Sequence, residues 1–373
     1  MNLLPLIGQY LIPFLVILSV VVFIHEYGHY WVARRNGVRV ESFSIGFGPE
    51  LFGRTDRHGT RWKVSAVPLG GYVKMLGDAD ATSSTVDVTA ARNPESFPAK
   101  SVWQRMAVVV AGPAANFIFA IVVLAILFTF SGRPFTPAEV GGVEPGSPAA
   151  SAGLEPGDRI TAVDGDDVAS FEELQLIVSE SAGEALALTV ERDGQPIAVT
   201  LTPALVEVTD RFGNVHNIGR IGVSRAGVEY RSVNPAAAVV EATAETWRMV
   251  VGTLKALYEM AVGSRGTAEL GGPLRIAQMS GQIAQDGLVP AIWFTAVLSI
   301  NLGLINLFPI PMLDGGHLLM YGIEAARGRP MTERSQEIAF RFGLAMVLSL
   351  MVFATWNDLV HLKIVEFFSS LIS

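Results

Sequence analysis

The sequence contains no cysteine and few charged residues, and each absence narrows what the protein can be. Without cysteine the chain forms no disulfide, and any bound metal must be held by histidine, aspartate or glutamate. Charged residues make up 17% of the chain, against about 25% in a soluble domain, and half of the residues are hydrophobic. The net charge of −8 argues against nucleic acid as a partner. The composition therefore indicates a membrane protein.

Four apolar segments are candidates for transmembrane helices, which need roughly 20 apolar residues each. Three of them contain no charged residue, and the fourth is shorter but strongly apolar. In chain order they are Leu3–Ile24, Met106–Phe130, Leu288–Leu313 and Phe342–Trp356. The first has no basic residue before its apolar run and no evident cleavage site, so we interpret it as a retained span rather than a signal peptide.

The charges of the connecting segments predict the orientation of these spans. Residues 34–105 hold 11 Lys and Arg against 7 Asp and Glu, and residues 320–341 carry four Arg. Residues 131–232 instead hold 16 Asp and Glu against 7 Lys and Arg. Because basic loops tend to remain in the cytoplasm, we expect the two basic segments on that side. The acidic segment and both termini then lie outside, which in a Gram-negative cell is the periplasm.

The acidic segment at residues 131–232 has the pattern of an inserted α+β domain. It contains Pro-Gly turns, short strand-like runs and one helical stretch near residues 171–179. The run Val143–Ile160 closely resembles a bacterial PDZ domain. The resemblance implies a receptor that pairs its sheet edge with an extended peptide. A spacer or size filter without a peptide ligand remains an alternative.

The first apolar segment leads directly into His-Glu-Tyr-Gly-His at residues 25–29, which is an HExxH motif. Residues i and i+4 share one helix face, so His25 and His29 can reach one zinc ion. Glu26 is placed to accept a proton from the attacking water. The alternative is two core histidines beside a stray glutamate, but ionisable groups in a membrane helix are costly and by default functional. The motif therefore predicts a zinc hydrolase.

A catalytic zinc site needs three protein ligands, so one more must come from elsewhere in the chain. Asp314 is the only acidic residue between Asp286 and Glu324, and it directly follows the third apolar segment. Two prolines before it break the helix, and two glycines after it allow a close approach of the backbone. We expect Asp314 to be the third ligand. The alternative is a helix cap at the cytoplasmic surface.

The two motifs together are specific. HExxH in a first span, with Asn306-x-x-Pro-x-Pro-x-Leu-Asp-Gly in a late one, resembles the site-2 protease family of intramembrane zinc metalloproteases, and within it the bacterial RseP-type group. Residues 46–49, 68–74 and 111–117 and the PDZ-like segment also match, so the resemblance covers nearly the whole chain. One departure is that RseP-type members have two PDZ domains, whereas this chain has room for one.

The resemblance implies a function and assigns roles to residues. His25, His29 and Asp314 would bind Zn²⁺, with Glu26 as general base and acid. The substrates would be single-span membrane proteins cut in the second step of regulated intramembrane proteolysis. Anti-sigma factors are one such class, and remnant signal peptides are another. The other partners would be the lipid bilayer and a peptide ligand of the PDZ-like domain, with no nucleic acid.

Two asparagines near the second motif are candidate substrate-binding residues. Asn306 resembles the asparagine that contacts substrate in this family, and Asn301 could help to clamp it. For both residues, ordinary hydrogen bonding between helices is equally open. His317 is better explained as a loop or supporting residue than as a ligand.

Two short segments between the first and second spans alternate like strands and end in glycine-containing turns. They are Phe43–Ile45 and Trp62–Val67. The resemblance implies a re-entrant β-loop that adds a strand to an unwound substrate. The alternative is a cytoplasmic hairpin with no role in substrate binding.

The predicted fold is a polytopic α-helical membrane protein of about four transmembrane helices, with a membrane-associated β-loop and an inserted α+β PDZ-like domain. The expected segments are a first transmembrane helix with HExxH (1–35), a cytoplasmic-side or re-entrant β-loop region (36–103), a second transmembrane helix (104–130), the PDZ-like domain (131–232), amphipathic helices on the periplasmic side (233–286), a third transmembrane helix with the second motif (287–318), a cytoplasmic loop (319–337), and a fourth transmembrane helix with a C-terminal tail (338–373).

Two rival functions remain open from the sequence. A non-catalytic membrane adaptor would use the PDZ-like domain to bind partners and would keep only a structural metal site. The intact Glu26 argues against it, because a structural site needs no base and usually closes all four positions with protein ligands. A transporter with a metal site at broken helices is the second rival, but the chain shows no paired inverted halves.

Overall fold

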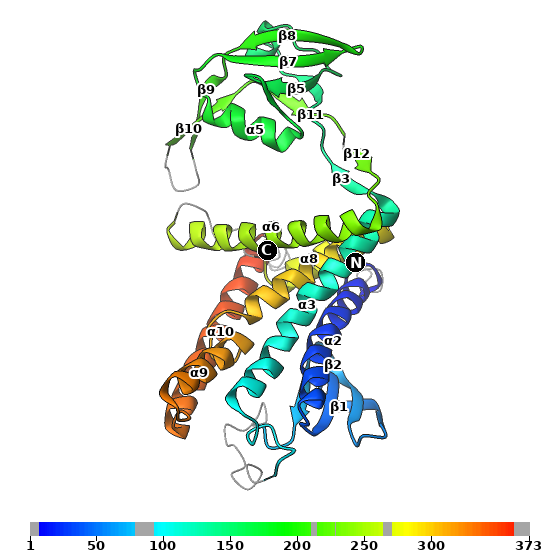
Figure 1. Ribbon diagram of the computed structural model, residues 1–373, viewed down its shortest axis with the longest axis vertical. Helices are drawn as coiled ribbons and strands as arrows, with labels where there is room; N and C mark the ends of the chain where they lie inside the picture. The colour runs from blue at the N-terminus through cyan, green and yellow to red at the C-terminus, as the bar shows by residue number, and fades with distance from the viewer. Residues whose placement is uncertain (1–6, 79–92, 210–214, 228, 264–270, 362–373) are drawn as a thin grey trace, which may run out of the picture. The chain divides into compact units, whose positions relative to one another are not determined.

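The structure is a computed structural model that describes residues 7–78, 93–209, 215–227, 229–263 and 271–361. The expected C-terminal tail after residue 361 lies outside the described residues. The chain divides into two compact units, a helix-rich first unit and a strand-rich second unit (Figure 1). The first comprises Met1–Ala125, Val239–Leu254 and Ala268–Ser373, and the second comprises Ile126–Ala238 and Lys255–Thr267.

The first unit consists of long helices and one pair of strands. In chain order its elements are the π-helical turn η1 (Ile7–Leu11), α2 (Ile12–Arg35), β1 (Val40–Thr55), β2 (Arg61–Met75), α3 (Val102–Ser131), α6 (Pro235–Ala261), α7 (Pro273–Asp286), α8 (Leu288–Asn306), α9 (Asp314–Arg327) and α10 (Glu333–His361), with the ends of α3 and α6 belonging to the second unit. Among the described residues, four helices are long and apolar enough to cross a membrane. They span Gly8–Arg35, Val102–Ser131, Leu288–Asn306 and Arg334–Asp358, which confirms the four predicted spans.

The third span is shorter than the apolar run that predicts it. Helix α8 ends at Asn306, although the uncharged sequence continues to Leu313. Pro309 and Pro311 cannot continue a helix, because each lacks the backbone N–H that the helical ladder requires. A new helix, α9, then begins at Asp314 and occupies much of the segment expected to be a loop.

Small residues allow the helices that carry the motifs to pack closely. A Cβ at Gly28 of α2 would collide with the carbonyl oxygen of Ala111 in α3. A Cβ at Gly303 of α8 would lie 3.1 Å from the carbonyl oxygen of Pro113 and 3.3 Å from Cβ of Asn116. Such small-residue contacts are the usual way in which membrane helices approach each other. They bring α2 and α8 against α3, beside the HExxH motif.

Strands β1 and β2 form an irregular antiparallel pair that contains both expected strand segments. Part of β1 has partners on both sides, since Ile45 pairs with Gly71 and also with Val64. The pair docks on α2 through aromatic side chains. The rings of Tyr30 and Trp62 pack edge to face, 5.0 Å apart. The β-loop is thus fixed to the helix that carries HExxH.

A buried aspartate connects the fourth span to α7. Asp358 of α10 accepts hydrogen bonds from the backbone N–H groups of Gly272, Leu274 and Arg275, at 2.8, 3.1 and 3.1 Å. The first amides of a helix have no carbonyl partner within the helix itself, and these donors lie at the start of α7. A carboxylate here also interacts favourably with the positive end of the helix dipole. Asp358 therefore caps a helix more than 80 residues away in sequence.

The second unit is an α+β domain. Its elements are β3 (Arg133–Phe135), β4 (Val140–Val143), α4 (Pro148–Ser151), β5 (Arg159–Val163), β6 (Asp166–Asp167), α5 (Phe171–Glu180), β7 (Leu186–Arg192), β8 (Gln195–Leu201), β9 (Ala204–Thr209), β10 (Val215–Arg220), β11 (Val223–Arg225) and β12 (Glu229–Arg231). The largest sheet has the order β6-β5-β7-β8. Its core includes Ile160, Leu174, Leu188 and Val190, so α5 and the sheet share one apolar interior.

One buried ion pair joins two parts of this unit. The Asp158 carboxylate accepts two hydrogen bonds from the Arg192 guanidinium, at 2.6 and 2.7 Å, and one from the backbone of Glu155, at 2.9 Å. The Arg192 hydrogen bond is the main reason why the pKa of Asp158 lies below its usual range. A bidentate pair of this kind, with two hydrogen bonds between guanidinium and carboxylate, is stronger than an ion pair with one hydrogen bond. It holds the start of β5 against the end of β7.

We expect Asp158→Asn to destabilise this unit by about 1–3 kcal/mol at neutral pH, because it removes the buried carboxylate of the pair and leaves the Arg192 guanidinium with only the exposed Glu155 as its charged partner. Since the folded-state pKa is lowered, the carboxylate stabilises the fold above its unfolded pKa of about 4 and loses this effect as pH falls. The difference between variant and wild type should therefore shrink below about pH 4. Hydrogen exchange of peptides from β5 and β7 in the full-length protein measures both effects.

The matched control is Glu144→Gln. Glu144 pairs with Arg220 in the same unit, but both side chains are largely exposed, at 58% and 61%. Exposed pairs contribute about 0–1 kcal/mol, so exchange in the control should hardly change. Equal exchange in the Asp158 variant and the wild type at neutral pH would contradict the stabilising role of the Asp158–Arg192 pair.

Candidate metal centre

His25 and His29 lie one turn apart on the buried face of α2, and their Nε2 atoms are 3.3 Å apart. The Nδ1 of His29 lies 2.9 Å from the carbonyl oxygen of Val108 in α3. A carbonyl oxygen only accepts hydrogen bonds, so Nδ1 must carry the proton. In a neutral His29, the Nε2 atom then carries a lone pair without a proton, which is what a metal ligand requires.

Asp314 is the first residue of α9, and the loop before it is shaped by the second motif. Met312 has a φ of 84°, in the left-handed region that non-glycine residues rarely adopt. A Cβ at Gly315 would collide with the carbonyl oxygens of Leu307 and Phe308. The turn between α8 and α9 can therefore be this tight only with glycine at that position. It delivers the Asp314 carboxylate to the histidines of α2.

The three expected ligands form a compact triangle. Asp314 Oδ2 lies 3.2 Å from Nε2 of His25 and 3.5 Å from Nε2 of His29. Two ligand atoms bound tetrahedrally to zinc at about 2.0–2.1 Å would be roughly 3.3 Å apart. The separations observed among His25, His29 and Asp314 therefore fit zinc. In the described part of the chain these residues are the one group of His, Asp and Glu side chains with ligand atoms close enough to share a metal ion.

The same triangle is unfavourable without a cation. Asp314 Oδ2 is buried, and none of the described residues donates a hydrogen bond to it. Two imidazole nitrogens lie within 3.5 Å of this oxygen, and the one on His29 presents a lone pair when the ring is neutral. Buried polar atoms normally have a partner, and an unpartnered carboxylate oxygen is costly. A bound metal ion satisfies all three groups at once.

Glu26 is half-buried on α2, next to His25, and its charge interacts with both histidines and with Asp314. The β-loop reaches the same place. A Cβ at Gly71 of β2 would lie 3.1 Å from Cγ of Glu26 and 2.8 Å from a methyl carbon of Val22. The glycine therefore leaves room for the Glu26 side chain and places the β-loop directly beside it.

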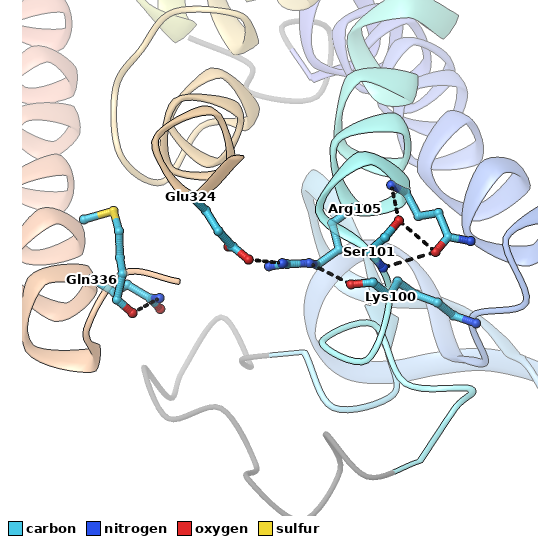
Figure 2. A network of polar contacts seen from close by, with 7 residues as sticks. Lys100, Ser101, Arg105, Glu324 and Gln336 are labelled. Carbon is cyan, nitrogen blue, oxygen red and sulfur yellow. Dashed lines mark hydrogen bonds and ion pairs between the residues drawn. The ribbon is translucent and has the colours of Figure 1, made fainter. Parts of the chain in front are cut away.

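An ion pair ties the start of α3 to α9. Figure 2 shows Arg105 of α3 between Lys100 and Glu324. Its guanidinium donates to the Glu324 carboxylate at 2.6 Å and to the carbonyl oxygen of Lys100 at 3.2 Å. The same guanidinium lies over the ring of Tyr321, 4.7 Å from its centre. These contacts fix α9, and with it Asp314, against the helix that supports His29.

The remaining candidates lie outside the triangle of His25, His29 and Asp314. Asn306 is the last residue of α8 and is half-buried. Asn301 accepts a hydrogen bond from Thr253 of α6, at 3.3 Å, which agrees with the interhelical alternative. His317 packs against the ring of Phe340, 5.5 Å away, and its nitrogens are not part of the ligand group.

Sequence reasoning missed two features of α3 that lie beside the histidines. Asn116 is fully buried, and its Nδ2 lies 3.2 Å from Nδ1 of His25. A Cβ at Gly112 would collide with Nε2 of His29, so this position admits only glycine. The signal in the sequence was a lone asparagine in an apolar span, four residues after a glycine and on the same helix face.

Comparison with known proteins agrees with this geometry. The model of peptidase family M50 matches residues 13–350. "Putative zinc metalloprotease Atu1380" of Agrobacterium fabrum is 45% identical, over 95% of this chain and 96% of its own length. "Metalloprotease MmpA" of Caulobacter vibrioides is 38% identical, over 97% of this chain and 98% of its own.

A more distant relative is "Regulator of sigma-E protease RseP" of Escherichia coli, which is 33% identical over 94% of this chain and 98% of its own. That alignment extends over 453 positions, more than the 373 residues of this chain, so RseP contains segments without a counterpart here. Among solved structures, the PDZ domain of a Listeria monocytogenes SdrC-like protein (Lmo2051) covers 25% of this chain and 90% of its own, with 20% identity and a TM-score of 0.20. The chain belongs to peptidase family M50, the site-2 proteases, and is a multi-pass membrane zinc metalloprotease.

Proposed function

We propose that this protein is an intramembrane endopeptidase that makes the second cut in regulated intramembrane proteolysis of single-span membrane proteins. His25, His29 and Asp314 hold the zinc ion, and Glu26 is the general base and acid. The observation that carries the proposal is the triangle of ligand atoms, 3.2–3.5 Å apart. Its two histidines lie in α2, a helix apolar enough to span the membrane, and Asp314 reaches them from the start of α9. Such a site would be accessible to a peptide bond that lies inside the bilayer.

Each residue of the site has a distinct task in this mechanism. His25, His29 and Asp314 would hold the zinc ion, which would supply Lewis-acid chemistry to the scissile carbonyl and the attacking water. Glu26 accepts the proton of the attacking water and then delivers it to the nitrogen of the leaving amine. The hydrogen bond to Val108 keeps His29 in the tautomer that binds metal. Asn306, at the end of α8, would contact the substrate. Asn301 would either help to clamp the substrate or only join α8 to α6 through its hydrogen bond with Thr253.

The β-loop would hold the substrate in extended form next to Glu26. A peptide bond in a helix is shielded by its own hydrogen bonds, so a transmembrane substrate must unwind before it is cut. Strand addition to β1 or β2 would replace the lost backbone hydrogen bonds. The support is the contact of Gly71 with Glu26 and the exposure of apolar side chains along both strands, such as Phe52 and Leu69.

Substituting Gly71 should therefore slow cleavage without removing zinc. In Gly71→Ala, the new methyl group pushes on the carbonyl oxygen of Ser44 in β1, on Val22 and on Glu26. Misplacement of a catalytic group by about 1 Å can cost up to 100-fold in rate. We expect a decrease of at least about tenfold. The control is Gly252→Ala on α6, where a Cβ meets no atom of the described residues within 4 Å. A wild-type rate in Gly71→Ala, or loss of its zinc, would argue against this placement of the β-loop.

The charge of the loops supports an orientation of this multi-pass inner-membrane protein. Residues 34–105 and 320–341 are rich in basic residues and would be cytoplasmic, whereas the acidic PDZ-like segment 131–232 would be periplasmic. The metal centre, at the end of the first span, would then lie near the cytoplasmic side. The PDZ-like domain would bind a peptide, or would exclude substrates whose outer domain has not yet been removed.

The natural substrates can be found with an inactive variant. Cells that carry Glu26→Gln in place of the wild type should accumulate truncated single-span proteins, which membrane proteomics detects. Anti-sigma factors are the expected class, by analogy with the relative named regulator of sigma-E protease, and remnant signal peptides are a second class. An adaptor without protease activity would leave the set of membrane fragments unchanged.

A further inference from the structure

Asn116 is an unusual residue for its position in the fold. It lies in the middle of α3, a membrane-spanning helix, and its side chain is completely buried. Its Nδ2 is 3.2 Å from Nδ1 of His25, and in the part of the chain that the structure describes no group donates a hydrogen bond to its Oδ1. A buried amide with one unpaired atom is costly in an apolar environment. The cost suggests that the side chain serves the neighbouring histidine.

The tautomer of His25 decides whether the nitrogen or the oxygen of the Asn116 amide should face its Nδ1. If Nδ2 donates to Nδ1, the proton of a neutral His25 must be on Nε2, the atom 3.2 Å from Asp314 Oδ2. That tautomer cannot bind zinc through Nε2. Rotating the amide by 180° exchanges two atoms of similar size and places Oδ1 opposite Nδ1. The buried oxygen then gains a donor, and Nε2 of His25 presents a lone pair.

We propose that Asn116 is a positioning residue of the zinc site, whose amide oxygen accepts the Nδ1–H of His25 and fixes the metal-binding tautomer. The arrangement parallels that of His29, whose Nδ1 pairs with the Val108 carbonyl of the same helix. Helix α3 thus orients both histidines, one through its backbone and one through Asn116. This inference rests on the proposed ligand role of His25.

Helix α8 contacts the backbone and Cβ of Asn116. Ser299 of α8 donates a hydrogen bond to the backbone oxygen of Asn116 at 3.0 Å. Gly303 of the same helix lets α8 approach to within contact of its Cβ. Because these two contacts reach the backbone and Cβ of Asn116, the effect of its amide can be tested separately from the effect of these contacts.

Two substitutions of Asn116 show whether its side chain accepts a hydrogen bond from His25 or donates one to it. Asn116→Leu keeps the size of the side chain and removes all hydrogen bonding, so zinc affinity should fall by about 10–100-fold. Asn116→Asp keeps an acceptor and removes the donor, so affinity should stay within about threefold of the wild type. The measurement is zinc retention by the full-length protein in detergent against a chelator of known affinity. Ser299→Ala is the packing control and should retain zinc like the wild type.

Each outcome decides the proposal. Wild-type zinc affinity in Asn116→Leu would overturn it, and so would an Asp variant as weak as the Leu variant, because the amide would then have to donate. If Asn116→Leu does not fold, the Asp variant decides alone: wild-type retention supports the proposal, and loss of zinc in a folded Asp variant overturns it. Failure of the wild type itself to bind zinc would instead refute the metal site.

Discussion

Replacing Glu26 by Gln should abolish cleavage while leaving the zinc ion in place. Glutamine has nearly the same size and fits beside Gly71, but it cannot accept a proton from water at neutral pH. Loss of a general base typically costs about 10²–10⁴-fold in rate. His25, His29 and Asp314 are unchanged, so elemental analysis of Glu26→Gln should still give about one zinc per chain.

The control for this variant is Glu41→Gln. Glu41 lies in β1, and its carboxylate pairs with the partly exposed Lys74 at 3.5 Å, away from the ligand group. Its removal should leave both rate and zinc content unchanged. Cleavage by Glu26→Gln at the wild-type rate would refute the general-base role, and loss of zinc would show that Glu26 supports the metal instead.

Replacing Asp314 by Ala should remove zinc as well as activity. Two histidines one turn apart remain, but they leave the ion with only two protein ligands, fewer than a catalytic site requires. The affinity for zinc should fall by more than about 100-fold, the upper end of the effect of losing a supporting partner of a ligand. Because Asp314 Oδ2 accepts no hydrogen bond from the described residues, its removal should not unfold the protein.

Chelator competition on the purified variant measures the affinity of this site directly. The control is Asp286→Ala at the end of α7, an exposed carboxylate outside the ligand group, which should keep wild-type zinc affinity. Unchanged affinity in Asp314→Ala would show that another group completes the site. The alternative role of Asp314 as a helix cap would then be favoured, because it begins α9.

The sequence predicted the parts of this site that depend on local rules. His25 and His29 are one helical turn apart, so their convergence follows from helix geometry alone. Asp314 could be inferred because a lone carboxylate followed two prolines at the end of an apolar run, where helix continuation is impossible. The four spans followed from the length of the uncharged segments in the same way.

Contacts between segments far apart in the sequence could not be predicted from such local rules. The pairing of Asn116 with His25 joins residues 91 positions apart, and that of Arg105 with Glu324 joins residues 219 apart. Hydropathy marks the helix that carries Asn116 but not the face that meets α2. The third span was predicted too long for a related reason, since absence of charge shows where a helix can lie in a membrane and not where it ends.

The most direct test of the account is to locate the bond that is cut. The purified protein and a single-span substrate should be reconstituted in liposomes, with zinc removed by a chelator and then restored. We expect cleavage only with zinc present, and mass spectrometry should place the cut within the apolar span of the substrate. A cut confined to the flanking soluble segments, or cleavage that persists without zinc, would contradict the claim that this protein is an intramembrane zinc protease.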